Sequence, residues 1–188
     1  MEKLVIGIVG KNGSGKDSVA DFLVDNYGAR KLVFSDMLKE ALSIFIDDNE
    51  IGRLDMSWLS TNLRDKYGEG VLARGMKRRV SSSKEEILVI SGVRDFGELE
   101  MIRSFQKNIF IAVKADPEIR WQRMTSRQIK ADDKVSFEDF LDREELESEK
   151  RIEDLCFSVD YTINNDGEKD SLFVEVDRML TDYLKKKF

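Results

Sequence analysis

The chain has 188 residues, of which 36% are charged, with a formal net charge of −6, one cysteine and no histidine. This length suits one compact domain with a substantial core. The composition excludes a catalytic histidine, a histidine-ligated metal, an internal disulfide and a multi-cysteine zinc site. The acidic balance argues against a nucleic acid polymer as partner, and the low use of cysteine fits a reducing cytoplasm.

The first elements form a strand, a glycine-rich loop and a helix. Residues 4–9 are apolar apart from one glycine and predict a buried parallel strand. Gly-Lys-Asn-Gly-Ser-Gly-Lys-Asp follows at residues 10–17, and a helix with one apolar face is expected over residues 15–27. The spacing Gly-x-x-x-x-Gly-Lys between a strand and a helix predicts a phosphate-binding loop.

The loop residues have separate predicted roles. Glycine permits positive φ and a close approach of the backbone to phosphate. Main-chain N–H groups from Asn12 to Asp17 are expected to converge on the β-phosphate, and the helix N-terminus adds partial positive charge. Lys16 would reach the β- and γ-phosphates and neutralise charge during transfer, which makes it a catalytic residue. The residues assigned to ATP binding are Gly10, Asn12, Gly13, Ser14, Gly15, Lys16, Asp17 and Ser18.

Asp17 breaks the pattern at its eighth position, where a Ser or Thr hydroxyl usually ligates Mg²⁺. A carboxylate is also a hard oxygen ligand, so we predict that Asp17 binds Mg²⁺ directly or through water. The alternative is that Asp17 only stabilises the first turn of the helix by interaction with the helix dipole.

A second strand is expected over residues 31–34, and a helix follows it. Asp36 lies near the start of this helix, where it either contacts a hydroxyl or ribose of an acceptor or acts as an ordinary N-cap. Residues 51–83 have a mostly helical pattern with one glycine-containing interruption. Arg74 follows that interruption and is a candidate contact for the phosphate of an acceptor.

A third strand is expected over residues 87–90, and Arg94 lies just past its end. Ligands bind at the carboxyl edge of open parallel sheets, so Arg94 is a candidate binding residue. The alternative is an ion pair with Glu98, one turn further along the next helix. A fourth strand follows at residues 109–113.

The helix after the fourth strand carries three arginines. Arg120, Arg123 and Arg127 have the spacing i, i+3 and i+7, which places them on one helix face. Phosphoryl transfer depends on positioning and positive charge, so we predict that at least one is catalytic, with Arg123 and Arg127 ahead of Arg120. The alternative is salt bridging with residues 142–154, of which ten in thirteen are charged.

A fifth strand over residues 161–164 and a final amphipathic helix complete the pattern. Strands that alternate with helices predict an α/β fold, with a five-stranded parallel sheet covered by helices on both faces, in one domain over residues 1–188. No stretch approaches the roughly 20 apolar residues that cross a bilayer, and the first residues suit a strand better than a signal peptide. We therefore expect a cytoplasmic protein without a membrane partner.

Several segments resemble known P-loop kinases. Residues 15–22, Gly-Lys-Asp-Ser-Val-Ala-Asp-Phe, resemble the loop of phage-type deoxynucleoside monophosphate kinases and phosphomevalonate kinases. Nearly the whole chain is similar to a group of archaeal, adenylate-kinase-related, dephospho-CoA-kinase-like P-loop proteins. The segments that carry this likeness are Phe-Ser-Asp-Met-Leu (34–38), Tyr-Gly-Glu-Gly-Val-Leu-Ala-Arg (67–74), Ser-Gly-Val-Arg-Asp-Phe-Gly-Glu-Leu-Glu (91–100), Ala-Asp-Pro-Glu-Ile-Arg-Trp-Gln-Arg (115–123) and Asp-Tyr-Thr-Ile-Asn-Asn (160–165).

The resemblance implies a nucleoside-monophosphate-kinase-like fold, with an acceptor-binding helical insert at about residues 36–83 and a lid near residues 124–136. It implies that the arginine-bearing helix leads into the lid and that Arg94 grips the phosphate of the acceptor. The implied activity is phosphoryl transfer from ATP with Mg²⁺ to a nucleotide-like acceptor, in a monomer or homodimer. A (deoxy)nucleoside monophosphate is the first candidate acceptor, and dephospho-CoA or another phosphorylated metabolite is the alternative.

One residue departs from that group. Its members usually end the third strand with an Asp that anchors Mg²⁺ through water, whereas this chain has Ser91. A hydroxyl is a weaker anchor than a carboxylate. Either Asp17, Asp36 or Asp95 compensates, or the protein is a nucleotide-binding regulator with little turnover.

Overall fold

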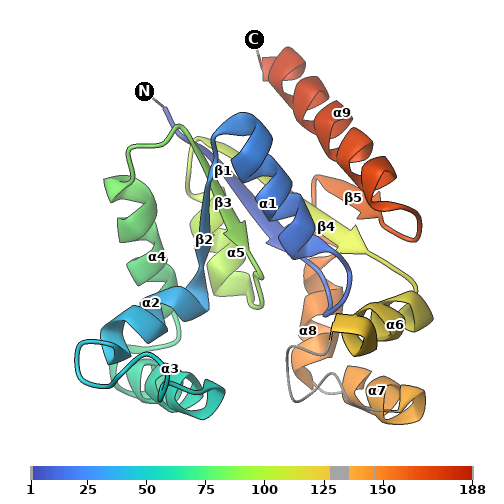
Figure 1. Ribbon diagram of the computed structural model, residues 1–188. Coiled ribbons are helices and arrows are strands. Elements are labelled where there is room, and N and C mark those ends of the chain that lie inside the picture. Colours follow the sequence, from blue (N-terminus) through green and yellow to red (C-terminus); the bar gives the residue numbers. More distant parts are fainter. Residues whose placement is uncertain (1, 128–135, 146, 188) are drawn as a thin grey trace.

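A parallel sheet forms the centre of the computed structural model, which describes residues 2–127, 136–145 and 147–187 (Figure 1). In the described part of the chain the sheet has five strands in the order β2-β3-β1-β4-β5, and every neighbouring pair is parallel. The predicted five-stranded parallel sheet is therefore confirmed. The strands are β1 (Leu4–Val9), β2 (Arg30–Val33), β3 (Ile87–Ser91), β4 (Lys107–Lys114) and β5 (Tyr161–Asn164).

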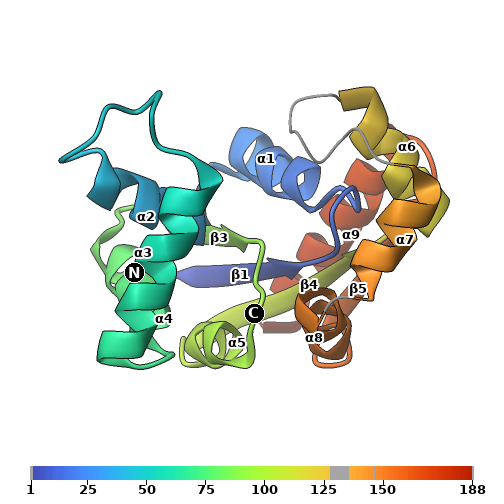
Figure 2. The ribbon, with the colours of Figure 1, turned by 90° about the horizontal axis from the view of Figure 1, so that it is seen from below.

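Helices cover both faces of the sheet, as Figures 1 and 2 show. One face packs against α1 (Lys16–Tyr27) and α9 (Lys169–Lys187). The other face packs against α2 (Phe34–Leu42), α4 (Val71–Ser82), α5 (Phe96–Arg103) and α8 (Glu147–Leu155). The remaining described helices are α3 (Arg53–Tyr67), which packs on α2 and α4, and α6 (Pro117–Arg127) and α7 (Phe137–Glu144), which pack on each other.

The residue pattern of β1 explains why the core has two halves. Leu4, Ile6 and Ile8 belong to the cluster beneath α1 and α9. Val5 and Val9 belong to the cluster on the opposite face. Successive side chains of a strand point to opposite faces, so a central strand with apolar residues at nearly every position needs helices on both sides.

The start of α2 differs from the prediction. β2 ends at Val33 and α2 begins at Phe34, with Val33 in extended conformation as the N-cap and no side-chain cap. Phe34 is buried in the core as the first residue of α2, whereas the sequence pattern predicted it as the last residue of the second strand. Asp36 lies inside the first turn of α2, and its predicted alternative role as N-cap is wrong.

The proposed insert and lid fall on identifiable elements. Residues 36–83 contain most of α2 together with α3 and α4, beside the β2 edge of the sheet (Figure 1). Residues 124–136 begin in α6, but 128–135 lie outside the described residues. The functions assigned to both segments stay predictions. Among the described residues, no helix has the length and apolar character needed to cross a membrane.

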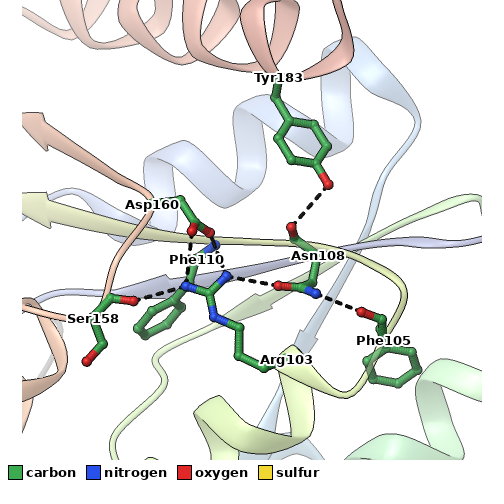
Figure 3. A network of polar contacts seen from close by, with 7 residues as sticks. All are labelled: Arg103, Phe105, Asn108, Phe110, Ser158, Asp160 and Tyr183. Carbon is green, nitrogen blue, oxygen red and sulfur yellow. Dashed lines mark hydrogen bonds and ion pairs between the residues drawn. The ribbon is translucent and has the colours of Figure 1, made fainter. Parts of the chain in front are cut away.

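A network of polar contacts connects several elements at the amino-terminal part of β4 (Figure 3). Arg103, the last residue of α5, donates to both carboxylate oxygens of Asp160 at 2.7 and 3.1 Å and to Asn108 Oδ1 at 2.9 Å. Asp160 also accepts from the Phe110 N–H at 2.7 Å, and the Tyr183 hydroxyl donates to the Asn108 carbonyl at 3.1 Å. The network joins α5, β4, the segment before β5 and α9, and it lies toward the amino end of β4, whereas open parallel sheets bind ligands at the carboxyl edge.

Candidate active site

The glycine-rich loop joins β1 to α1, and its shape is set by what packs behind it. Gly13 has φ +78° and Gly15 has φ +96°, in the left-handed region that favours glycine. A Cβ atom on Gly13 would lie 2.6 Å from the Arg120 carbonyl oxygen, and one on Gly10 would lie 2.5 Å from the Val113 carbonyl oxygen. The packing of β4 and α6 against the loop therefore leaves no room for a side chain at Gly10 or Gly13.

Asn165 fixes the loop from the other side. This residue follows β5, is buried, and donates from Nδ2 to the Ser14 carbonyl at 2.8 Å. A Cβ atom on Gly15 would lie only 2.2 Å from that same Nδ2. Arg123 in turn donates to the Asn165 carbonyl at 2.8 Å and to the Gly167 carbonyl at 3.3 Å. The phosphate loop, the segment after β5 and α6 are thus connected by hydrogen bonds.

Ser14 is fully buried inside the loop. Its N–H donates to the Lys11 carbonyl at 3.2 Å, so this one N–H group turns into the loop instead of toward a ligand. Its hydroxyl has no hydrogen-bond partner within the described residues. The N–H groups of the first turn of α1 have no intrahelical acceptor, as at any helix start, and they stay the predicted anion-binding groups of the loop.

Asp17 faces Ser91, and the two positions that the sequence linked are in contact. Ser91 Oγ, at the end of β3, donates to Asp17 Oδ1 at 3.1 Å. Lys31 Nζ, from β2, lies 3.4 Å from the same oxygen and 2.9 Å from Asp21 Oδ1, one turn along α1. The Asp17 side chain is still 62% exposed, so its carboxylate is accessible to a ligand.

The charges around Asp17 keep it ionised. Partial burial acts to raise the pKa of Asp17, but the positive charges of Lys16 and Lys31 and the hydrogen bond from Ser91 outweigh it. The pKa of Asp17 therefore lies below its ordinary value. Asp17 also lies in the first turn of α1, so the dipole alternative and the metal role are both compatible with its position.

Arg120 lies in a buried ion pair. It is 4% exposed, donates to both carboxylate oxygens of Glu144 at 2.8 and 2.7 Å, and donates from Nε to the Ala115 carbonyl at 3.0 Å. Lys11 of the phosphate loop lies 3.0 Å from the same Glu144. Burial acts to raise the pKa of Glu144, but its contacts with Arg120 and Lys11 outweigh burial and lower it. The alternative of salt bridging with the following acidic segment is thus realised for Arg120.

The three arginines are not equivalent. Arg123 contacts the segment after β5, as described above, while Arg120 packs toward α7. Arg127 is the last residue of α6, and its side chain lies outside the described part of the chain. A cavity of about 240 Å³ lies between the start of the loop and α8, with Gly10, Lys11, Ser14, Arg120, Glu144 and Cys156 among its lining residues.

The three candidate acceptor residues are exposed and lie on different elements. Asp36 is in α2, and Arg74 is in α4, where it donates to the Tyr67 carbonyl at 2.7 Å. Arg74 also borders a surface hollow of about 560 Å³ together with other residues of α4, away from the cavity beside the loop. Arg94 follows β3, and its main-chain N–H donates to Glu98 Oε2 at 2.7 Å. Glu98 therefore does contact Arg94, through the backbone.

Glu98 is the most perturbed carboxyl group near this edge of the sheet. It is 4% exposed at the start of α5, and its own N–H donates to the N-cap residue Asp95 at 2.8 Å. Burial and, second, the nearby Asp95 carboxylate raise the pKa of Glu98 from 4.5 to about 7, against the opposing effects of the Arg94 N–H and Arg64.

The chain resembles known proteins in sequence and in structure. Residues 6–151 match a family model described as an AAA domain. UPF0200 proteins of Saccharolobus islandicus and Saccharolobus solfataricus are 32% identical over 165 residues, which covers 87% of this chain and 85% of theirs. This chain belongs to the UPF0200 family. A UPF0200 protein of Methanothermobacter thermautotrophicus is 29% identical over 168 residues, covering 89% and 84% of the two chains.

The solved structures that resemble this UPF0200 chain share its fold. TT1252 from Thermus thermophilus aligns with a TM-score of 0.62 and 21% identity over 97% of this chain and 98% of the other. Shikimate kinase from Bacteroides thetaiotaomicron aligns with a TM-score of 0.63 and 13% identity over 95% and 98%. Shikimate kinase from Acinetobacter baumannii gives 0.58 and 17% over 99% and 96%. The chain therefore has a P-loop kinase-like fold.

Sequence reasoning missed the contacts that four residues of this site make. Lys31 was assigned only to a strand, Asn165 was not assigned to the loop, and Lys11 and Glu144 were not paired. The contact of Asn165 with Ser14 and that of Lys11 with Glu144 join residues that are distant in the sequence. Lys31 is closer in sequence to Asp17 and Asp21, but it reaches them only because α1 packs beside β2. The acidic residues 142–154 gave the one usable signal, because they identified where a partner for Arg120 could lie.

Proposed function

We propose that this UPF0200 protein transfers the γ-phosphoryl group of ATP to a nucleotide-like acceptor, with a (deoxy)nucleoside monophosphate as the first candidate. The observation that carries the proposal is the phosphate loop, whose glycines have left-handed backbone conformation and whose Lys16 opens α1. Backbone N–H groups at a helix start together with a lysine suit the terminal phosphates of a nucleoside triphosphate.

Mg²⁺ is the metal that this chemistry uses, and the residues present fit it. Asp17 offers an ionised, exposed carboxylate, and Ser91 offers a hydroxyl in contact with it. Both are hard oxygen donors of the kind that Mg²⁺ takes alongside the phosphates of its nucleotide. When bound, Mg²⁺ would neutralise charge on those phosphates.

The chain's own residues have distinct proposed tasks. Lys16 neutralises negative charge on the oxygens of the transferring phosphoryl group, and Arg123 or Arg127 adds positive charge from the lid side. Arg94 and Arg74 orient the phosphate of the acceptor, and Asp36 orients its hydroxyl or ribose. Arg120 is the weakest catalytic candidate of the three arginines, because its guanidinium is committed to Glu144. Residues 36–83 serve as the acceptor-binding insert, and the lid lies near residues 124–136.

Two other functions have support of their own. Dephospho-CoA or another phosphorylated metabolite is the alternative acceptor within the kinase class, and the shikimate kinases among the structural neighbours add shikimate to the molecules worth testing. A nucleotide-binding regulator with little turnover is favoured by Ser91 at the end of β3 and by the lysine that already contacts Asp17.

An acceptor screen distinguishes these functions. Release of ADP from ATP and Mg²⁺ is measured with AMP, dAMP, CMP, dCMP, UMP, dTMP, GMP, dephospho-CoA and shikimate in turn. The proposal expects at least one acceptor to stimulate release about tenfold or more, and Lys16→Met to abolish the stimulation while Lys185→Met, an exposed change on α9, retains it. If ADP and Mg²⁺ bind but no acceptor in the panel stimulates turnover, the regulator is favoured instead.

A further inference from the structure

Lys31 has no task yet in the proposed phosphoryl transfer, although it contacts Asp17. Its side chain is 26% exposed and reaches from the edge strand β2 to the first turns of α1. There it lies 3.4 Å from Asp17 Oδ1 and 2.9 Å from Asp21 Oδ1. Lys31 therefore bridges two carboxylates spaced i and i+4 on one face of α1.

We propose that Lys31 is an internal counter-ion of Asp17 that sets how tightly the site binds a divalent cation with its nucleotide. This inference rests on the proposed function, because it concerns the metal role of Asp17. A cation on Asp17 meets an oxygen that already accepts a hydrogen bond from Ser91 and contacts the Lys31 ammonium. The ammonium and the divalent cation repel each other and share one negative charge, so each weakens the other.

Asp21 adjusts the strength of this competition. Its contact with Lys31 is shorter, 2.9 Å against 3.4 Å for Asp17, so a second carboxylate shares the ammonium and reduces its hold on Asp17. Without the Asp21 charge, Asp17 would be the one remaining carboxylate of this pair in contact with the Lys31 ammonium, and the two would interact more strongly. The arrangement also bears on Ser91: a carboxylate at that position would add a second negative charge beside Asp17, whereas a hydroxyl leaves Asp17 as the charge that both cations share.

The experiment measures binding of Mn²⁺ in the presence of saturating ADP, from the fall of the electron paramagnetic resonance signal of free Mn²⁺. Lys31→Met should bind Mn²⁺ roughly three- to fivefold more tightly than wild type, the size expected for one partly screened charge. Lys31→Arg keeps the charge and should match wild type. Asp21→Asn should bind Mn²⁺ roughly two- to threefold more weakly, with Asp17 and Lys31 both in place.

The outcomes separate the two proposals. Unchanged or weaker Mn²⁺ binding by Lys31→Met, with normal binding by wild type, would overturn the counter-ion role and leave the proposed function intact. Wild-type protein that binds ADP no better with Mn²⁺ than without it would overturn the metal role of Asp17 and this inference with it. If Lys31→Met fails to fold, Asp21→Asn decides: binding equal to or tighter than wild type rejects the competition.

Discussion

The buried carboxyl group of Glu98 makes the stability of this protein dependent on pH near neutrality. Its pKa rises from 4.5 in the unfolded chain to about 7 in the fold, a difference of about 2.5 units, or about 3 kcal/mol at 1.36 kcal/mol per unit. Because the folded-state pKa is the higher one, the fold favours the protonated carboxyl. The stabilisation is complete below about pH 4.5, is lost as the pH rises toward 7, and is absent above pH 7.

Glu98→Gln tests this reasoning, because glutamine keeps an acceptor for the Arg94 N–H and cannot ionise. The free energy of unfolding of wild type and variant is measured by urea denaturation at pH 5, 6, 7 and 8. The variant should gain relative to wild type as the pH rises, by about 2.5 kcal/mol between pH 5 and pH 8. Glu100→Gln, an exposed change on the same helix, corrects for the removal of one negative charge from α5.

Two results would refute the argument for Glu98. If both glutamine variants show the same dependence on pH, burial does not raise the pKa of Glu98. If wild type gains relative to Glu98→Gln as the pH rises, the Arg94 N–H and Arg64 stabilise the carboxylate more than burial and Asp95 destabilise it. The fold would then favour the ionised form, with the opposite sign of linkage.

Three further predictions concern the loop and the two ion-pair networks. Gly15→Ala should lower the free energy of unfolding by about 1–2 kcal/mol and weaken ADP binding in calorimetry, because Gly15 has a positive φ and its Cβ would meet Asn165. The control Gly167→Ala, which has open space around it, should change neither quantity. Arg120→Met should destabilise by about 3 kcal/mol in urea because it leaves Glu144 with one partner fewer, and a loss of turnover at unchanged stability would contradict this structural role. Arg103→Met should cost about 1–2 kcal/mol in the same assay through loss of its several partners, and a cost below about 0.5 kcal/mol would class it with ordinary surface ion pairs.

The fold was more predictable than the site because its signals are local. The apolar run at residues 4–9 is typical of a buried strand and matches β1 residue for residue, and the strand predicted over residues 161–164 matches β5. The predicted start of α2 was wrong because phenylalanine has a high intrinsic propensity for strands. Burial of Phe34 in the assembled core places it in the helix instead. The phosphate loop was predictable because its glycines are fixed by spacing within eight residues.

The sequence named residues 142–154 as a possible salt-bridge partner for the three arginines, but it could not assign that partner to Arg120 in particular. Equal spacing placed Arg120 and Arg123 on one face of α6, yet each turns to a different partner, Glu144 or the Asn165 carbonyl. Which partner an arginine reaches depends on how α7 and the segment after β5 pack on α6. The sequence lists the Glu144 carboxylate and the Asn165 carbonyl, but it does not tell which of the two lies within reach of each arginine.

The contact between Ser91 and Asp17 changes the question that the sequence raised about the metal. The resemblance to the archaeal group implies an Asp where this chain has Ser91, and the sequence left open whether Asp17 takes over the proposed metal role. The two side chains touch, because Ser91 Oγ at the end of β3 donates a hydrogen bond to Asp17 Oδ1 at the start of α1. One carboxylate and one hydroxyl, both hard oxygen donors, therefore lie together at the phosphate loop. The carboxylate at the start of α1 also lies within reach of Lys31. If Asp17 binds the metal, we therefore expect the Lys31 ammonium to compete with the metal for this carboxylate.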